Sequence, residues 1–442
     1  MSVKVCKFGG TSMADGNVIR RVKDIIDGDS RRKYIVVSAP GKRYSADVKV
    51  TDLLYKCHAH LMQTGECGES FSAIRARFIS IVKELNLDFD ITAVLDETEA
   101  RIAEEKSEDF TASRGEYLSA RIVAEVLGAK FIDAEDVIFF KENGGFDGER
   151  SYREISKAVS GAERAVLPGF YGRGADGKVK TFSRGGSDVS GAIVARAVNA
   201  SVYENWTDVS GFLACDPRIA DSPKNIKRIS YKELRELSYM GANVLHSDSI
   251  FPVRRANIPI QIKNTFRPED EGTSILPSSR YTPSGRVVTG IAGKKNFTVI
   301  FIEKSHMNAE IGFICKVMEV LFAEGVSVEH IPSGIDTMSL VIESSQLSGD
   351  KLSAITERIK EAVAPDVIRV TENIALIATV GHGMSSSVGT SARLFQAIAS
   401  ANINIKMIDQ GSSELNIIVG VKNEDYEKCI RAIYSEFFAS EK

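Results

Sequence analysis

The chain has 442 residues, too many for one hydrophobic core of ordinary size, and this length predicts two or three domains. Its composition, 43% hydrophobic and 26% charged, is that of an ordinary globular protein, and a formal charge of −3 argues against nucleic-acid and anionic-membrane partners. No apolar run approaches the roughly 20 residues of a membrane span, so we expect a cytoplasmic protein.

The cysteines have no Cys-x-x-Cys pair and no nearby histidine pattern. This spacing argues against a zinc site and against a disulfide framework, so we expect reduced packing residues. The six are Cys6, Cys57, Cys67, Cys215, Cys315 and Cys429.

Residues 3–8 alternate as a buried strand does, carry Lys7 near the end, and turn at Gly9 and Gly10 before a helical pattern over residues 17–27. Adjacent glycines let the backbone approach a ligand, and we expect the following helix N-terminus to add a partial positive charge beside the Lys7 ammonium. The residue order is not that of a P-loop. We predict a phosphate-binding turn, with a simple polar turn as the alternative.

Residues 34–40 form a continuous apolar run, typical of a parallel strand buried on both faces. Ser38 falls at its carboxyl end, where open α/β sheets bind ligands, although a serine at such a place is more often a turn former. We predict a mobile loop over residues 41–50 and a helix beyond it with Thr51 as N-cap.

Residues 51–127 have mostly helical patterns. Glu116 is expected at the start of a helix, where it either favours the helix dipole or faces an ammonium group in a cleft. Residues 130–140 and 164–170 are predicted strands. The Gly-x-Gly-x-x-Gly run at 172–177 precedes a strand pattern rather than a helix, so we interpret it as a hairpin turn and not as a dinucleotide motif.

A second Gly-Gly turn at residues 183–188 leads into a helix over 189–199. Arg184 offers a guanidinium that matches a carboxylate or phosphate bidentately, and Asp188 at the helix start is placed to hold Lys7 or a magnesium ion. Residues 201–212 form another strand and turn with the single tryptophan, Trp206.

Three motifs in this order resemble those of the aspartate kinases, members of the amino-acid kinase superfamily. They are Lys-Phe-Gly-Gly-Thr-Ser at 7–12, Arg-Gly-Gly-Ser-Asp at 184–188, and Trp-Thr-Asp-Val at 206–209 with Asp-Pro-Arg at 216–218. The resemblance implies an α/β amino-acid kinase fold, a mainly parallel sheet sandwiched by helices, over residues 1–280. It also implies MgATP and L-aspartate as substrates.

By this resemblance Lys7, Gly9 and Gly10 hold the phosphates and Asp188 organises Lys7. The implied aspartate pocket consists of Ser38, Thr51, Glu116, Phe170, Arg184 and Ser187, and the implied nucleotide contacts are Thr207, Asp208, Arg218 and Asn243. The family usually carries lysine where this chain has Asn243, and proline where it has Ser247. The first difference removes a cation expected near the ATP phosphates.

Phosphoryl transfer to an aspartate carboxylate is chemistry that these site residues could support. The aspartate side chain has a reference pKa of about 3.9, so as an acceptor it is already ionised and needs no general base. Phosphoryl transfer then depends on in-line positioning and on cations that neutralise the moving group. We expect Arg184 to bind the α-carboxylate and Glu116 the α-ammonium of the substrate.

Residues 259–264 are the expected last strand of this domain, and residues 267–290 have the composition of a linker. We therefore predict a linker over 281–294 and two further domains, 295–370 and 371–442, which repeat at a spacing of 77 residues. Each copy has a βαββαβ-like α+β pattern and resembles the amino-acid-sensing ACT domain. In this arrangement the last strand of the second copy is free to return to the first.

Known ACT pairs bind effectors where a strand of one unit meets a helix of its partner. The matching residues are Met307, Gly312, Phe313, Ile314, Val328 and Glu329. Glu329 is either a partner for the ammonium of lysine or a solvated acid at a strand end. By resemblance we expect a homodimer or a dimer of dimers assembled through the ACT sheets.

Together these features predict a cytosolic ATP-dependent aspartate kinase that makes 4-phospho-L-aspartate, the first step of lysine, threonine and methionine biosynthesis, under feedback by lysine, threonine or both. Two alternatives remain at this stage. One is another carboxylate or carbamate kinase of the same fold, and the other is a catalytically weak amino-acid sensor, for which Asn243 is the only support.

Overall fold

The computed structural model describes residues 2–183, 185–242, 245, 247–282 and 285–439. These residues divide into two compact units. The first comprises Met1–Phe212, Asn225–Leu234 and Asn243–Tyr281, and the second comprises Leu213–Lys224, Arg235–Ala242 and Thr282–Lys442. The sequence suggested one boundary near residue 280, whereas two short earlier segments group with the C-terminal residues.

The first unit contains an eight-stranded sheet. In spatial order its strands are β10 (Arg228–Ser230), β12 (Thr273–Leu276), β11 (Ile260–Asn264), β7 (Val202–Thr207), β1 (Lys4–Phe8), β2 (Arg32–Val37), β4 (Ala165–Pro168) and β3 (Lys130–Phe131). All neighbours pair in parallel except β11 and β12, which are antiparallel. The mainly parallel α/β sheet predicted from the sequence is confirmed.

Two sequence predictions about this sheet were wrong. The strand expected over 130–140 ends after Phe131, because the side chain of Asp133 accepts a hydrogen bond from the Glu135 amide and caps the short helix α6 (Ala134–Val137). The polar stretch expected to be only a linker contains β12, whose Thr273 and Ile275 are buried. Composition alone did not reveal this short strand, which pairs with both β10 and β11.

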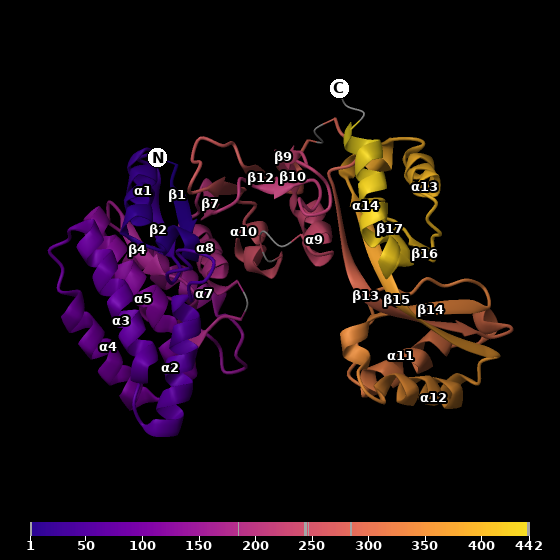
Figure 1. Ribbon diagram of the computed structural model, residues 1–442, viewed down its shortest axis with the longest axis horizontal. Helices are drawn as coiled ribbons and strands as arrows, with labels where there is room; N and C mark the ends of the chain where they lie inside the picture. Colours follow the sequence, from indigo (N-terminus) through magenta and orange to yellow (C-terminus); the bar gives the residue numbers. More distant parts are fainter. Residues whose placement is uncertain (1, 184, 243–244, 246, 283–284, 440–442) are drawn as a thin grey trace. The chain divides into compact units, whose positions relative to one another are not determined.

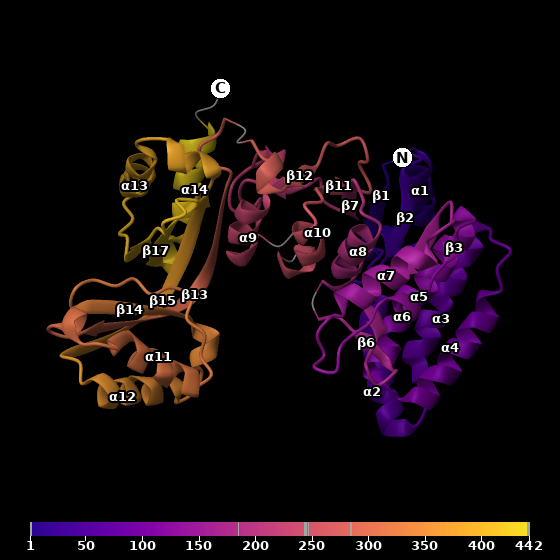
Figure 2. The same cartoon turned by 180° about the vertical axis from the view of Figure 1, so that it is seen from behind.

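The helix-rich block predicted after residue 50 is confirmed. It consists of α2 (Val50–Thr64), α3 (Gly68–Leu85), α4 (Ile91–Glu105) and α5 (Glu108–Leu127), which Figures 1 and 2 show as helices packed against one another. The other helices of this unit include α1 (Gly16–Asp27), α7 (Gly148–Ala158), α8 (Gly186–Ala197) and α10 (Phe251–Arg255), and α9 (Tyr231–Tyr239) starts in it. Among the described residues, no helix combines the length and the apolar character needed to cross a membrane.

The predicted hairpin around residues 172–177 is also confirmed. Strand β5 (Tyr171–Arg173) pairs antiparallel with β6 (Val179–Thr181), with Gly172 opposite Lys180. The glycine pattern between them therefore serves a turn.

Strands β1 and β7 pair in parallel register, with Lys7 beside Asn205 and Cys6 beside Glu204. Because side chains alternate between the faces of a sheet, the two strands present different chemistry on each side. On one face the Phe8 and Trp206 rings stack with centroids 5.8 Å apart. On the other face Asn205 reaches Asp188 of helix α8.

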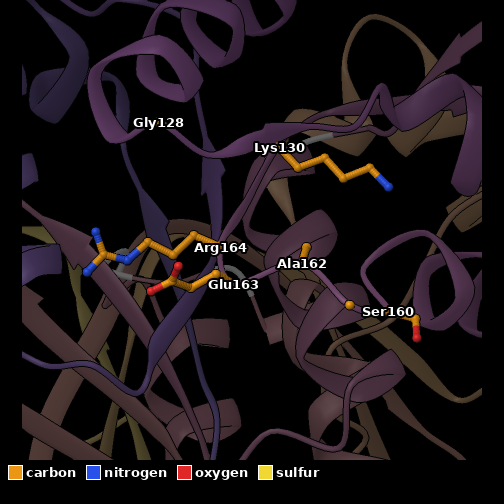
Figure 3. A pocket seen from close by; sticks show the side chains of 7 residues that line it. Gly128, Lys130, Ser160, Ala162, Glu163 and Arg164 are labelled. Atoms are coloured by element: carbon orange, nitrogen blue, oxygen red, sulfur yellow. The ribbon is translucent and has the colours of Figure 1, made fainter.

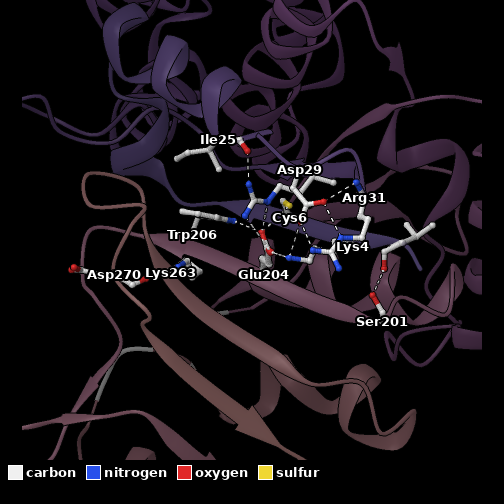
Figure 4. A network of polar contacts seen from close by, with 12 residues as sticks. Lys4, Cys6, Ile25, Asp29, Arg31, Ser201, Glu204, Trp206, Lys263 and Asp270 are labelled. Carbon is white, nitrogen blue, oxygen red and sulfur yellow. Dashed lines mark hydrogen bonds and ion pairs between the residues drawn. The ribbon is translucent and has the colours of Figure 1, made fainter. Parts of the chain in front are cut away.

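Glu204 is the centre of a buried polar network on the Trp206 face (Figure 4). Its carboxylate lies 2.6 Å from Lys4 Nζ and 2.8 Å from Arg32 Nε, and it accepts a hydrogen bond of 3.0 Å from Trp206 Nε1. Burial by itself raises the pKa of Glu204, but Arg32 and Lys4 outweigh it, so the pKa lies below its usual value. This ion cluster joins β1, β2 and β7.

The second unit contains a five-stranded antiparallel sheet in the order β14 (Thr337–Glu343), β13 (Gly290–Glu303), β15 (Val367–Val380), β17 (Asn416–Lys422) and β16 (Met407–Asp409). Four helices pack on it: α11 (Phe313–Ala323), α12 (Lys351–Val363), α13 (Thr390–Ser400) and α14 (Tyr426–Tyr434). Figure 1 shows α11 and α12 against the part of the sheet with β14, and α13 and α14 against the part with β17.

The 77-residue repeat appears directly in this unit. Helices α11 and α13 each have eleven residues, start 77 positions apart, and follow a glycine in the left-handed region, Gly312 with φ 81° and Gly389 with φ 88°. The sheet and the four helices of this unit therefore form two α+β ACT-type modules, as predicted.

Strands β13 and β15 each have 14 residues and serve both modules. Residues 290–294 of β13, which we expected to lie in a linker, pair with the segment of β15 that also pairs with β17. Among the described residues no strand follows α14, so the second module completes its sheet with a segment that precedes the first module. The expected arrangement had a final strand returning to the first module.

The Glu204 cluster makes a testable prediction. In Glu204→Gln the buried guanidinium of Arg32 loses its counter-ion, and Lys4 keeps only its pair with Asp29. We therefore expect unfolding of the first unit to become easier by about 3 kcal/mol. Trp206 is the only tryptophan and touches the cluster, so urea unfolding followed by its fluorescence reports this region directly.

Glu154→Gln is the matched control, because Glu154 forms only surface pairs with Arg153 and Lys157. It should change the unfolding free energy by less than about 0.5 kcal/mol. Equal effects of the two substitutions would contradict the structural role of Glu204.

Candidate active site

The first Gly-Gly turn starts where β1 ends. The Gly9 amide donates a hydrogen bond of 3.0 Å to the Trp206 carbonyl, which continues the pairing with β7. A short 3₁₀-helix, Gly10–Met13, follows, and α1 begins only at Gly16 with the Asp15 side chain as its cap. Helix α1 therefore does not follow the Gly-Gly turn directly, and a contribution of its N-terminus to the charge at Gly9 stays a prediction.

Glycine is favoured at positions 9 and 10 of this turn for two different reasons. A Cβ on Gly10 would lie 3.0 Å from the Ala39 carbonyl oxygen and 3.3 Å from the Gly41 nitrogen, so the loop after β2 packs directly against Gly10. A Cβ on Gly9 would lie 3.6 Å from Lys7 Nζ. A side chain at Gly9 would thus cover the Lys7 ammonium, which glycine leaves accessible.

The second Gly-Gly turn leads into α8. Gly185 has φ 73°, a conformation that favours glycine, and it caps the helix at its N-terminus. Asp188 lies in the first helical turn. Arg184 lies outside the described residues.

The structure brings the two turns together. Lys7 Nζ and Asp188 Oδ1 are 2.6 Å apart, and Lys7 is only 8% exposed. Asn205 Nδ2 donates to the same oxygen at 3.0 Å. Asn205 was missed from the sequence, although a polar residue on the Lys7 face of a buried strand was an available signal.

Glu116 lies close to this pair, near enough for the Lys7 charge to act on its carboxyl group. It is 5% exposed, and its Oε2 atom has no hydrogen-bond partner among the described residues. Burial raises its pKa to about 8, against the opposing effects of a hydrogen bond from the Ala39 backbone and the charges of Lys7 and Arg114. A buried carboxyl oxygen without a partner suits a cationic ligand.

The local placement of Glu116 differs from the prediction. Helix α5 begins at Glu108, so Glu116 lies in the third turn and not at the N-terminus. The helix-dipole explanation for this acid therefore fails. Helix α5 approaches the loop after β2 closely, since a Cβ on Gly115 would lie 2.6 Å from Ala39 Cβ.

Ser38 and Thr51 lie at the two ends of this loop: Ser38 directly follows β2, and Thr51 is in the first turn of α2. The Ser38 amide donates to the Phe8 carbonyl at 3.1 Å, which fixes Ser38 next to the end of β1. The prediction that Thr51 is the N-cap of α2 was wrong. The helix starts at Val50, and the cap position is Lys49. The Val50 amide donates to the Pro40 carbonyl at 3.1 Å and so ties α2 to the loop.

Phe170 and Ser187 belong to two segments that pack together: Gly169 beyond β4 approaches Ser187, and Gly186 of α8 approaches Phe170. Phe170 has φ 79°, which is unusual for a residue with a side chain, and its amide donates a hydrogen bond of 3.0 Å to Ser190 Oγ. A Cβ on Gly169 would lie 2.7 Å from Ser187 Cβ, so the β4 end and the first turn of α8 pack closely.

The implied nucleotide residues are distributed over both units. Thr207 is the last residue of β7 and Asp208 follows it, and Asn264 Nδ2 donates to the Asp208 carbonyl at 3.4 Å. Arg218 belongs to the second unit, is exposed, and pairs with Asp216 at 2.6 Å. Asn243 lies outside the described residues.

The implied effector residues all belong to the second unit. Met307 and Phe313 are core side chains of the first ACT module, Val328 packs against that core, and Ile314 is 45% exposed. Gly312 precedes α11. The Glu329 carboxylate accepts a hydrogen bond from the Tyr239 hydroxyl.

Two surface hollows lie away from this cluster. One, of about 320 Å³, is lined by Lys130, Arg164 and neighbouring residues at the starts of β3 and β4 (Figure 3). The other, of about 490 Å³, is bordered by α1 and Trp206, on the opposite face from Lys7. Open α/β sheets bind ligands at the carboxyl ends of strands, so the Lys7 cluster is the better candidate.

Comparison with known families agrees with this assignment. The chain matches the amino acid kinase family over residues 2–264 and an ACT domain over residues 377–437. It is 38% identical to aspartokinase 3 of Bacillus subtilis, with 99% of each chain covered.

Solved structures give the same result. The Clostridium acetobutylicum aspartate kinase superposes with a TM-score of 0.94 at 53% identity, covering 98% of this chain and all of that one. Escherichia coli aspartokinase III, solved with aspartate and ADP, has a TM-score of 0.76 at 26% identity, covering 99% of this chain and all of that one. Its complex with lysine and aspartate has a TM-score of 0.73 at 27% identity, with 99% of each chain covered.

The raised pKa of Glu116 predicts a pH-dependent effect on stability. A carboxyl group with a folded-state pKa of about 8, above its ordinary 4.5, costs stability as the pH rises between these values. Glu116→Gln removes this cost, so the variant should gain stability relative to the parent chain between pH 5 and pH 8.5, measured by thermal unfolding. Glu125→Gln, at an exposed position of the same helix, is the control. A pH-independent difference for Glu116→Gln would contradict the prediction.

Proposed function

The chain belongs to the aspartokinases of the amino acid kinase family and is an ATP-dependent aspartate kinase, and we propose that it works through the site around Lys7 and Asp188. At this site the γ-phosphoryl group of ATP passes to the side-chain carboxylate of L-aspartate to give 4-phospho-L-aspartate. The observation that carries this assignment is the 2.6 Å contact between Lys7 and Asp188, because it joins the two Gly-Gly turns at one point.

Lys7 supplies the positive charge of the transfer step. Its ammonium is held by Asp188, which is itself fixed by Asn205, so the cation needs little reorganisation when charge moves between donor and acceptor. The aspartate side chain attacks as a carboxylate, which makes a general base unnecessary. The protein therefore contributes position and charge rather than proton transfer.

We propose magnesium as the second cation. Among the described residues no group of three or more His, Cys, Asp or Glu side chains has the arrangement of a metal site. This agrees with an ion that is held by one or two carboxylates together with substrate phosphates, as Mg²⁺ commonly is. When bound, Mg²⁺ would neutralise phosphate charge, and we propose Asp188, which lies beside Lys7, as a carboxylate that contacts it.

We assign the α-ammonium of aspartate to Glu116, whose unpartnered buried oxygen fits a cation. Ser38, Thr51, Phe170 and Ser187 are proposed as the rest of the pocket. Arg184 is proposed as the ligand of the α-carboxylate on its sequence position alone. For the nucleotide we propose Gly9 and Gly10 with Thr207, Asp208, Arg218 and Asn243.

We further propose that lysine, threonine or both regulate the enzyme through the ACT modules. E. coli aspartokinase III has been solved with lysine, which supports lysine as an effector here. Glu329 is the proposed partner of the effector ammonium, with Met307, Gly312, Phe313, Ile314 and Val328 around it. Since Met307 and Phe313 are buried, their contribution would come from the backbone. We also propose a homodimer or dimer of dimers assembled through these modules.

A cytoplasmic location is proposed from the cysteines. All six are free thiols, five of them buried, as is usual for proteins of a reducing compartment.

Replacing Lys7 tests the active site. Lys7→Met removes the cation while keeping much of the side-chain length, and kcat should fall by about 10²–10³-fold, the usual loss for one electrostatic stabiliser. ADP release from MgATP with aspartate measures this. Lys23→Met, on the exposed side of α1, should keep the parent rate. A Lys7→Met variant within twofold of the parent kcat would place the active site elsewhere.

Replacing Glu329 tests the effector site. Lysine should reduce aspartate-dependent ADP release, and Glu329→Gln should raise the lysine concentration for half inhibition by about tenfold, since a charged hydrogen bond contributes roughly 1.5 kcal/mol. Titrations with lysine and with threonine, at fixed aspartate, distinguish the two effectors. Unchanged lysine inhibition in Glu329→Gln would remove this residue from the effector site.

A further inference from the structure

Arg77 of helix α3 is a buried cation that the mechanism above does not use. Its side chain is 5% exposed and reaches the loop between β2 and α2. Nη1 donates to the carbonyl oxygens of Gly41 at 3.1 Å and Ala14 at 3.5 Å. Nη2 donates to Asp47 Oδ2 at 2.6 Å and to the Val48 carbonyl at 3.5 Å. One guanidinium thus holds three points of this loop and the chain beyond the first Gly-Gly turn.

Asp47 is the counter-ion of Arg77 and is itself nearly buried. Its carboxylate also accepts hydrogen bonds from the Arg43 amide at 3.0 Å and from Arg43 Nε at 2.9 Å. The Arg43 guanidinium and amide, followed by the charge of Arg77, hold the pKa of Asp47 well below its usual range. The loop we expected to be mobile over residues 41–50 is therefore anchored by an ion network.

The segment held by Arg77 is in direct contact with the phosphate turn. The Gly41 amide donates to the Gly10 carbonyl at 2.7 Å, and a Cβ on Gly41 would lie 2.7 Å from the Gly10 carbonyl carbon. The same loop carries Ser38 and Ala39, and the Ala39 backbone bonds the Glu116 carboxyl group. A shift of Gly41 therefore moves both the Gly10 turn and the surroundings of Glu116.

We propose that Arg77 is a positioning residue for the transfer reaction, which fixes the loop after β2 against the Gly9–Gly10 turn and thereby sets the aspartate pocket. This inference rests on the proposed assignment of Ser38 and Glu116 to that pocket. Arg77 itself touches neither substrate. Its role follows from the geometric demand that acceptor and donor be aligned, where a displacement of about 1 Å costs up to 10²-fold.

Arg77→Lys is the deciding variant. Lysine keeps the charge and can still reach Asp47, but it loses the fork that binds Gly41 and Ala14 at the same time. We expect the aspartate KM to rise by about tenfold and kcat to fall, at temperatures where circular dichroism shows a folded chain. The double variant Arg77→Met with Asp47→Asn removes both charges together, avoids an unpaired buried ion, and should show the same rise in KM.

Arg75→Lys is the matched control. Arg75 lies on the same helix and pairs with Asp96 and Glu99 of α4, away from the loop, so its KM values should match those of the parent. A merely structural role of Arg77 would lower the melting temperature and the amount of folded enzyme without changing KM. An aspartate KM in Arg77→Lys within about twofold of the parent value would overturn the proposal.

Glu116→Gln, assayed alongside, separates this inference from the proposed pocket. If Glu116→Gln raises the aspartate KM and Arg77→Lys does not, only the role of Arg77 is overturned. If Arg77→Lys raises it and Glu116→Gln does not, the assignment of Glu116 fails while the positioning role of Arg77 is supported.

Discussion

The parallel register of β1 with β7 is the constraint on which the first unit depends. Pairing Lys7 with Asn205 places both on the face that α8 covers, and it places Phe8 and Trp206 on the other face. A slip of one residue would exchange the two faces and separate Lys7 from Asp188. The Glu204 cluster opposes such a slip, because its ion pairs join β1, β2 and β7 and a slip would move Lys4 away from Glu204.

Two buried carboxyl groups of this unit illustrate how environment divides structural from functional acids. Glu204 is fully surrounded by donors, its pKa is lowered, and it has no capacity left for a ligand. Glu116 has an oxygen without a partner among the described residues, and its pKa is raised to about 8. A protein tolerates the cost of such an unmatched group where a ligand completes its hydrogen bonds. The contrast supports a binding role for Glu116 and a folding role for Glu204.

The sequence predicted best those features that lie within one short stretch of the chain. The Gly-Gly turns, the parallel strands and the ACT repeat follow from local patterns, and Lys7 and Asp188 could be named because each lies within such a motif. Asn205 and Arg77 could not be found in this way, since their importance comes from contacts across 17 and 36 positions of the chain. The predictions of short elements were wrong for a related reason. Strand β12 depends on tertiary pairing, and the end of β3 depends on one hydrogen bond to the side chain of the cap Asp133, and composition encodes neither.

In the second unit, two long strands are shared by both ACT modules. Each long strand, β13 and β15, bears one module on one half and the other module on its other half. Near the junctions, Asn296 and Asn373 adopt positive φ values of 70° and 60°, and the register between the strands shifts between Lys294 and Val299. These irregularities localise bending to the point where the modules meet. Because packed interiors deform poorly, a ligand that alters one half of β13 must be accommodated either at this junction or in the other module. The shared strands thus give the two ACT modules a direct mechanical connection, which two independent domains joined by a flexible linker would lack.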